Sequence, residues 1–172
     1  MLRPVIAFTL RQWLAIALAT SLAMLAIAHA FQTFGGLQPC HLCLEQRTVY
    51  WVAIPVALVG LALSAMPGLA RQTPLIGWLL ALVFMVGAGI AVFHAGAEWK
   101  WWSAPESCSG IHSVTAADLA RLMRGERLAK PRCDVAAWRF LGLSMAGWNA
   151  LISVKLAGWS IAFAVTHGRA KR

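Results

Sequence analysis

Four cysteines are arranged in two pairs along the chain. Cys40 and Cys43 form a Cys-x-x-Cys motif, and Cys108 and Cys133 stand in a later polar segment. A Cys-x-x-Cys motif suits disulfide exchange, because one thiolate attacks a partner and the other cysteine resolves the mixed disulfide. A second pair within reach of the first predicts a relay that passes a disulfide between them.

The first pair has a sequence context that favours a thiolate. Pro39 suits a loop that turns into a helix, which places Cys40 and Cys43 in the first turn of that helix. A helix N-terminus stabilises an anion and so favours an ionised thiol. Arg47 follows Cys43 by four residues and shares its helical face. A cation at the membrane boundary is costly without a partner, so Arg47 is a candidate site residue.

Three other uses of these cysteines were weighed. Covalent haem attachment needs histidine directly after the second cysteine, where this chain has Leu44. A zinc site takes four thiolates, but Cys108 and Cys133 are spaced more widely than a usual zinc knuckle. A purely structural disulfide suits this second pair better than the first. We therefore favour redox chemistry and expect no metal.

The composition indicates a membrane protein. The chain has 172 residues, of which 60% are hydrophobic and 12% charged, and its mean hydropathy is +0.68. Soluble domains carry roughly 25% charged residues. The net charge of +9 raises the possibility of nucleic-acid binding. No recognition module accompanies that charge, so we expect membrane lipid and no nucleic acid as a partner.

Four apolar segments are long enough to cross a bilayer, which takes about 20 helical residues. They cover residues 13–34, 49–66, 75–97 and 145–166, with loops over 35–48 and 98–144. Because backbone groups in lipid must bond within their own segment, helices are expected. The prediction is an all-α membrane protein: one domain over 1–172, a four-helix transmembrane bundle with a long periplasmic loop between the third and fourth helices.

Two of these segments have unusual features. Ala28-His29-Ala30 resembles a signal peptidase site, but the apolar run before it is long for a signal sequence, so we expect the first span to be retained. In the last span Asn149, Ser153 and Ser160 share one helical face, and Lys155 lies on another. Lys155 snorkels, pairs within the bundle, or marks a shifted boundary. We assign it no catalytic role.

The charge distribution predicts the topology. The two termini and the short turn over 67–74 contain basic residues and no acid, whereas all six acids fall in the other loops. The positive-inside rule then makes the termini cytoplasmic, although the loop over 98–144 is also basic. Both cysteine pairs fall on the opposite side, where disulfides persist. The two arguments agree that both cysteine pairs lie on the non-cytoplasmic side of the membrane.

The chain resembles the disulfide bond formation protein B (DsbB) family over nearly its whole length. The resemblance is carried by Pro39-Cys40-His41-Leu42-Cys43 with Arg47, by Cys108, and by Cys133-Asp134 followed by the stretch from Trp138 to Met145. It implies a bacterial inner-membrane protein with periplasmic cysteines. The implied activity is that of a protein dithiol:quinone oxidoreductase that passes electrons from a periplasmic DsbA-like thiol oxidase to the respiratory quinone pool, with ubiquinone or menaquinone as the cofactor.

The resemblance also implies a role for each site residue. A partner thiolate attacks Cys108, and the released Cys133 exchanges with Cys40. Cys43 then becomes the thiolate that faces the quinone, where Arg47 stabilises it. His94 approximately matches a family histidine near the quinone, with a loop spacing that differs by about one residue; the alternative is a histidine that packs at the interface.

Two competing functions remain open from the sequence. A thiol-disulfide carrier that moves electrons out of the cytosol needs cysteines accessible from both sides, and here all four lie on one side. A membrane protein with a thiolate metal site and a structural loop disulfide is the other alternative, which metal analysis of the purified protein separates from an oxidase.

Overall fold

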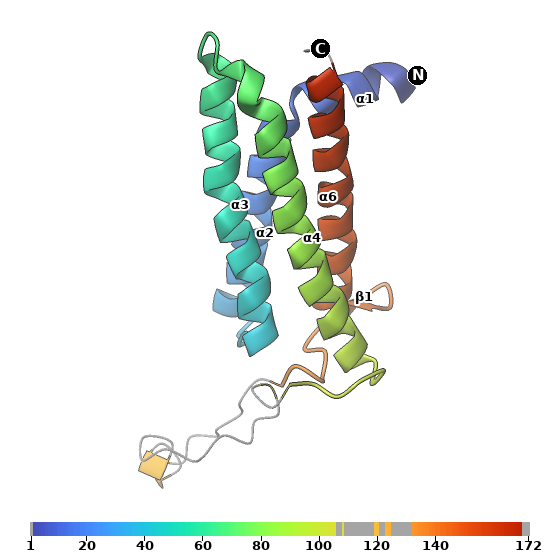
Figure 1. The fold of residues 1–172 in the computed structure, drawn as a ribbon. Helices are drawn as coiled ribbons and strands as arrows, with labels where there is room; N and C mark the ends of the chain where they lie inside the picture. The colour runs from blue at the N-terminus through green and yellow to red at the C-terminus, as the bar shows by residue number, and fades with distance from the viewer. Residues whose placement is uncertain (1, 106–107, 109–118, 121–122, 125–131, 170–172) are drawn as a thin grey trace.

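The computed structural model describes residues 2–105, 108, 119–120, 123–124 and 132–169, and its frame is a bundle of long helices (Figure 1). The helices are α1 (Leu2–Arg11), α2 (Trp13–Thr33), α3 (His41–Ala65), α4 (Thr73–Glu98) and α6 (Met145–Arg169). The 3-10 helix η1 (Ala70–Gln72) leads into α4, and strands β1 (Arg139–Phe140) and β2 (Leu143–Ser144) precede α6.

The expected all-α membrane fold is confirmed. In the described part of the chain, α2, α3, α4 with η1, and α6 are each long and apolar enough to cross a membrane. Many large apolar side chains point outward, as lipid-facing residues do, among them Leu22, Leu58, Leu82 and Leu151. Within the expected loop over 98–144, residues 106–107, 109–118, 121–122 and 125–131 lie outside the described residues.

One boundary differs from the sequence-based prediction. The second helix begins at His41, whereas the apolar run predicted a span from residue 49 and a loop over 35–48. The reason is that Cys40 caps the helix: its sulfur accepts a hydrogen bond from the backbone N–H of Cys43 at 3.4 Å. The first turns of α3 are helical although their residues are too polar to be recognised as part of an apolar span. Hydropathy therefore places the start of the apolar span after the start of the helix, whereas the prediction from Pro39, with Cys40 and Cys43 at the first turn, is confirmed.

Close packing of α4 against α6 builds the centre of the bundle. At Gly77 of α4, an added Cβ would lie 2.8 Å from the ring of Phe163 on α6, so only glycine permits this approach. Trp13 of α2 donates from Nε1 to Ser160 Oγ of α6 at 3.1 Å. Lys155, by contrast, is exposed on the outer face of α6, so it does not point into the bundle.

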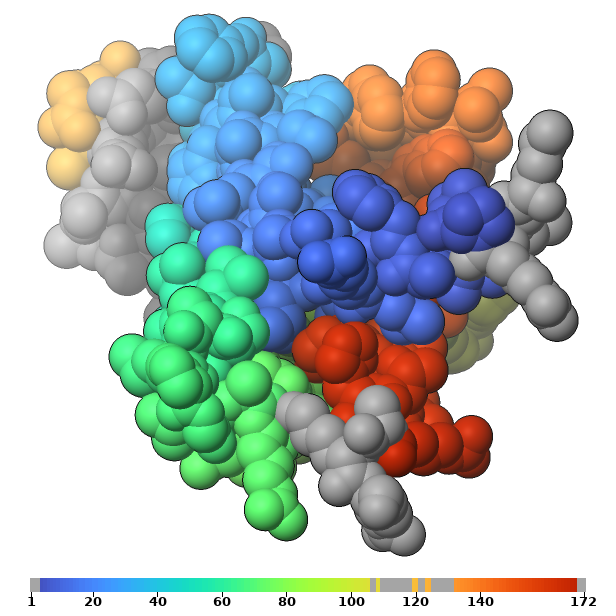
Figure 2. All heavy atoms as spheres, turned by 90° about the horizontal axis from the view of Figure 1, so that it is seen from above, coloured from blue at the N-terminus to red at the C-terminus, as the bar shows by residue number. Residues whose placement is uncertain are grey.

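The two ends of the bundle differ. Helix α1, the turn between α3 and α4, and the end of α6 lie together at one end, as the view down the bundle in Figure 2 shows. The strands and the start of α3 lie at the other end (Figure 1). Basic residues such as Arg11 and Arg71 belong to the first end, whereas all four cysteines belong to the second.

Candidate functional site

The first cysteine pair lies where α3 begins. Cys40 and Cys43 are free thiols whose sulfur atoms are 2.9 Å apart, with Cys40 as the hydrogen-bond donor. The hydrogen bond to Cys43, followed by burial, raises the pKa of the Cys40 thiol. The proton shared by the pair therefore stays on Cys40, and Cys43 is the sulfur that receives the hydrogen bond.

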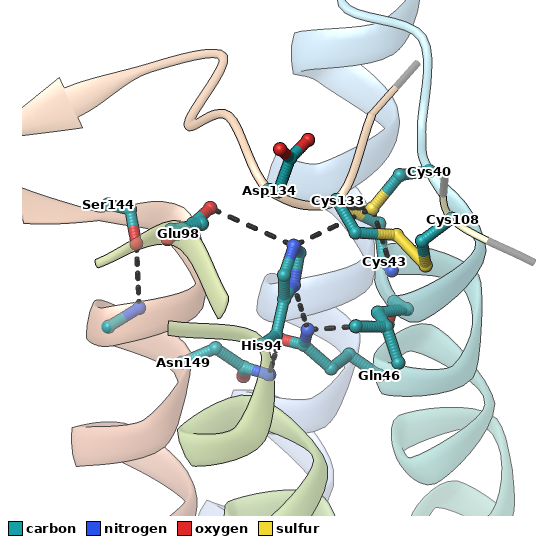
Figure 3. Close-up of polar contacts among 12 residues, drawn as sticks. Cys40, Cys43, Gln46, His94, Glu98, Cys108, Cys133, Asp134, Ser144 and Asn149 are labelled. Carbon is teal, nitrogen blue, oxygen red and sulfur yellow. Dashed lines mark hydrogen bonds and ion pairs between the residues drawn. A yellow bond between two sulfur atoms is a disulfide. The ribbon is translucent and has the colours of Figure 1, made fainter. Parts of the chain in front are cut away.

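The second pair forms a disulfide next to the first. Cys108 and Cys133 are bonded, with Cα atoms 5.3 Å apart, and both side chains are buried. The sulfur of Cys133 lies within 4.8 Å of both Cys40 Sγ and a ring nitrogen of His94, and Figure 3 shows the three side chains together. Disulfide exchange needs this kind of approach, because a thiolate must reach a disulfide sulfur. The structure thus brings both pairs to one place.

His94 of α4 stands between the two pairs and the bundle interior. Its side chain is buried, and Nε2 lies 3.7 Å from Cys40 Sγ and 3.7 Å from Glu98 Oε1. The other oxygen of Glu98, Oε2, is buried and has no hydrogen-bond partner within the part of the chain that the structure describes. Glu98 was not singled out from the sequence, although its position one helical turn after His94 was a usable signal.

A buried chain of polar side chains continues from His94 into the bundle. Gln46 Nε2 lies 2.8 Å from His94 Nδ1, and Asn149 Nδ2 donates to Gln46 Oε1 at 2.6 Å. Tyr50 donates its hydroxyl proton to Asn149 Oδ1 and lies 3.4 Å from Ser153 Oγ. The polar face predicted for the last span thus points inward. Sequence reasoning did not connect it to Gln46 or to His94.

The side chain of Arg47, one helical turn after Cys43, is held in place by hydrogen bonds to α2. Its guanidinium donates to Gln32 Oε1 at 2.6 Å and to the carbonyl oxygen of Ala28 at 3.0 Å, both on α2. Of its five N–H donors, three remain for other acceptors. Among the described residues, Arg47 is therefore held by hydrogen bonds to Gln32 and Ala28 and not by an acidic partner.

A cavity of about 370 Å³ opens beside Cys43, and Arg47 and His94 form part of its wall. Most of the wall is apolar, and its aromatic members come from α2, α3, β1, α6 and the segment before β1: Phe31, Tyr50, Phe140, Trp148 and Trp138. Cavities of about 300–1,000 Å³ with apolar walls and few polar groups are typical of small-molecule sites. The site thus joins a dithiol, a cation and an imidazole to an apolar cavity.

Comparison of the sequence with known proteins assigns the chain to a family. The family model described as "Disulfide bond formation protein DsbB" matches residues 10–163. The chain belongs to the DsbB family. Disulfide bond formation protein B of Dechloromonas aromatica is 29% identical over 168 residues, which cover 93% of this chain and 95% of that protein. The corresponding protein of Acidovorax sp. is 30% identical, over 90% of this chain and 83% of its own length. No solved structure matched the chain.

Membership in the DsbB family makes the chain a disulfide-forming membrane oxidoreductase. The sequence predicted Cys40, Cys43, Cys108, Cys133, Arg47 and His94 as site residues, and the structure gathers these six around one cavity and one sulfur cluster. Cys40, His94 and Cys133 also present three atoms of metal-ligand type. Because Cys133 is held in a disulfide, it offers no thiolate to a metal in this state.

A surface ion-pair cluster anchors the loop disulfide of this DsbB family member. Asp134, next to Cys133, accepts hydrogen bonds from Arg132 Nη2 at 2.8 Å and from Lys100 Nζ at 2.7 Å. Arg132 first, and then Lys100, hold the pKa of the Asp134 carboxyl far below its usual range. Lys100 also donates to the backbone carbonyl of Asp134. The cluster thus ties the segment around Cys133 to the end of α4.

Proposed function

We propose that this chain is a protein dithiol:quinone oxidoreductase that reoxidises a periplasmic DsbA-like disulfide donor and passes the electrons to membrane quinone. One observation carries the proposal: Cys43 and Arg47 border an apolar cavity, while Cys40, beside Cys43, lies within 4.8 Å of the loop cysteine Cys133. One end of the dithiol thus faces a small-molecule site and the other end faces a disulfide.

The residues around the cavity fit a quinone. Apolar walls suit an isoprenoid tail, and the free N–H groups of Arg47 suit a ring oxygen that gains charge on reduction. The bound quinone supplies the two-electron oxidation. Gln32 and Ala28 hold the guanidinium in place, so the cation is already oriented before the quinone enters. Both ubiquinone and menaquinone satisfy these requirements.

The electron path begins at the loop. A partner thiolate attacks Cys108, the electron pair of the disulfide leaves with Cys133, and the partner becomes bonded to Cys108. The Cys133 thiolate attacks Cys40 of an oxidised Cys40–Cys43 pair, which releases Cys43 as a thiolate. The partner's second thiol then displaces Cys108, and the partner leaves oxidised.

The loop disulfide is restored by its own cysteines. The Cys108 thiolate attacks Cys133, the electron pair leaves with Cys40, and the Cys40–Cys43 dithiol remains. The described state has this redox pattern, with a closed loop disulfide and two free thiols. Oxidation of that dithiol by quinone completes the cycle, with two electrons and two protons transferred for each new disulfide.

The proposed setting is the bacterial inner membrane, with the termini in the cytoplasm and the cysteines in the periplasm. The basic end that contains Arg11 and Arg71 supports this orientation, because positive residues are retained on the cytoplasmic side. Labelling of a single added cysteine with a membrane-impermeant maleimide tests it. A cysteine in the turn between α3 and α4 should stay unlabelled in intact spheroplasts.

The test of the activity is an anaerobic assay with reduced DsbA-like partner and ubiquinone or menaquinone. The proposal predicts quinone loss that stops when any of the four cysteines is replaced by serine. Gly89→Ala is a matched control, because an added methyl group meets nothing within 4 Å there. Stoichiometric zinc in the purified protein together with no quinone reduction would instead support the metal-binding alternative.

A further inference from the structure

The polar chain inside the bundle assigns the tautomer of His94. The Gln46 side-chain nitrogen donates to the carbonyl oxygen of Leu42 at 3.2 Å, and a carbonyl can only accept, so this contact favours the orientation in which the nitrogen faces His94. The same nitrogen faces His94 Nδ1 at 2.8 Å and has only protons to offer. Nδ1 of His94 is therefore the acceptor.

The rest of the chain supports the same direction. Asn149 Nδ2 donates to Gln46 Oε1 at 2.6 Å, and the hydroxyl of Tyr50 donates to Asn149 Oδ1. Every donor in this series meets an acceptor, and Gln46, Tyr50 and Asn149 are all buried. Reversal of one amide would set two donors or two acceptors against each other in the low-dielectric interior, which is strongly unfavourable.

With Nδ1 as acceptor, the proton of a neutral His94 ring is on Nε2. That nitrogen faces Cys40 Sγ and Glu98 Oε1, each at 3.7 Å. A distance of 3.7 Å is too long for a hydrogen bond to oxygen but lies within the reach of the larger sulfur atom. The Nε2 proton therefore points to the end of the ring where Cys40 Sγ and the backbone of Cys133 both lie as acceptors.

We propose that Gln46 and Asn149 are positioning residues that hold His94 in its Nε2–H tautomer, so that the imidazole donates a hydrogen bond to the Cys40 thiolate. The step in which this thiolate forms is taken from the proposed function, in which Cys40 is the leaving group when Cys108 attacks Cys133. A hydrogen bond to that sulfur stabilises the departing charge and speeds its release.

The other groups around Cys40 are known from the structure. Among the described residues, Cys43 of α3 and Glu98 of α4 are the titratable groups next to Cys40 and His94, and the Cys108–Cys133 disulfide does not titrate. Arg47 acts electrostatically on Cys43, and Arg139 acts on Glu98. Asp134 beside Cys133 is neutralised by Lys100 and Arg132. Asn149 and Ser153 bring no charge from α6.

The test uses the full chain with Cys43→Ser, in which Cys40 is the one free thiol while the loop disulfide stays closed. Asn149→Asp keeps the side-chain shape but cannot donate to Gln46. The Gln46 amide should then turn its oxygen to His94, which moves the ring proton to Nδ1. Histidine ¹⁵N resonances should report this move, and the ultraviolet thiolate titration of Cys40 should rise by about one pH unit.

Two further variants separate the tautomer from other effects. Gln46→Met removes the donor without adding a charge and should also raise the Cys40 titration midpoint. Ser153→Ala, at the far end of the chain, should leave it unchanged. If His94 keeps its proton on Nε2 in Asn149→Asp, or if Gln46→Met titrates like Ser153→Ala, the proposal is wrong. No quinone or partner enters the assay, so failure of the proposed function would leave this result unaffected.

Discussion

The sulfur atoms of Cys40 and Cys133 lie within 4.8 Å of each other, although one residue precedes α3 and the other precedes β1. Cys133 is bonded to Cys108, whereas Cys40 is a free thiol that is hydrogen-bonded to Cys43. The two pairs therefore meet through one specific cysteine of each. The other member of the first pair, Cys43, is left to face the cavity.

The first prediction concerns that contact. In the double variant Cys43→Ser with Cys108→Ser, the two remaining cysteines should form a Cys40–Cys133 disulfide, because their sulfur atoms are already close. Mass spectrometry of peptides from non-reduced protein measures its yield. The matched variant Cys40→Ser with Cys108→Ser leaves Cys43 and Cys133 and should give much less cross-link. Equal yields would contradict the assignment of Cys40 as the exchange partner.

The second prediction concerns Arg47. Arg47→Lys keeps the charge but cannot donate to Gln32 and to the Ala28 carbonyl while presenting a planar fork to the cavity. The KM for quinone should rise about tenfold, which corresponds to the loss of roughly one charge-assisted hydrogen bond. Stopped-flow exchange with the partner thiol, measured without quinone, should be unchanged.

A matched substitution isolates the anchoring of Arg47. Gln32→Leu removes one hydrogen-bond acceptor of the guanidinium but leaves the cation itself, so its effect on the KM for quinone should be smaller than that of Arg47→Lys. An Arg47→Lys protein that binds quinone normally but exchanges slowly with the partner would place the function of Arg47 at the thiols instead.

The third prediction concerns helix packing. Gly77→Ala places a methyl group 2.8 Å from Phe163 and 2.9 Å from the Cβ of Ala164, so α4 and α6 must separate. The expected loss of stability is about 1–3 kcal/mol. Gly89→Ala on the same helix meets nothing and should be neutral or stabilising by up to about 1 kcal/mol. Thermal unfolding in detergent compares the two, and similar midpoints would contradict the close approach.

The fourth prediction concerns pH. Arg132 and Lys100 lower the pKa of Asp134 below its ordinary value of 3.8, so ionised Asp134 stabilises the folded state. This contribution is complete above the ordinary pKa and is lost as the pH falls below it, because the unfolded chain then binds the proton first. The stability difference between the protein and Asp134→Asn should therefore be constant above about pH 5 and shrink below about pH 4. A difference that grows on acidification would contradict this.

Much of the fold follows from the sequence, because long apolar segments that cross a membrane are expected to be helical. The predicted segment over 13–34 agrees with α2 to within one residue, and the fourth begins at Met145 as expected. The apolar span alone begins later than α3, since the first turns of this helix are polar, but the position of Pro39 correctly predicted a helix start at Cys40. The β1–β2 hairpin was not predicted. Its turn needs positive φ at both Leu141 and Gly142, and only the glycine signals it.

The candidate site was predictable to a lesser degree. Cysteine spacing and the position of Arg47 after Cys43 are local signals that a sequence displays directly. The series from Tyr50 through Asn149 and Gln46 to His94 depends instead on how three helices are rotated about their axes. No spacing within one helix contains that information. For the same reason the polar face of α6 was visible in the sequence while its partner on α3 was not.

Single-turnover reduction of quinone tests the central claim most directly. Oxidised protein is loaded with quinone under anaerobic conditions and mixed with a limiting amount of reduced DsbA-like partner, and quinone absorbance is followed with time. The account predicts one quinol for each partner disulfide formed, with quinol formation abolished by Cys43→Ser while the partner still forms a mixed disulfide with Cys108. Full quinol formation in the Cys43→Ser protein would contradict it.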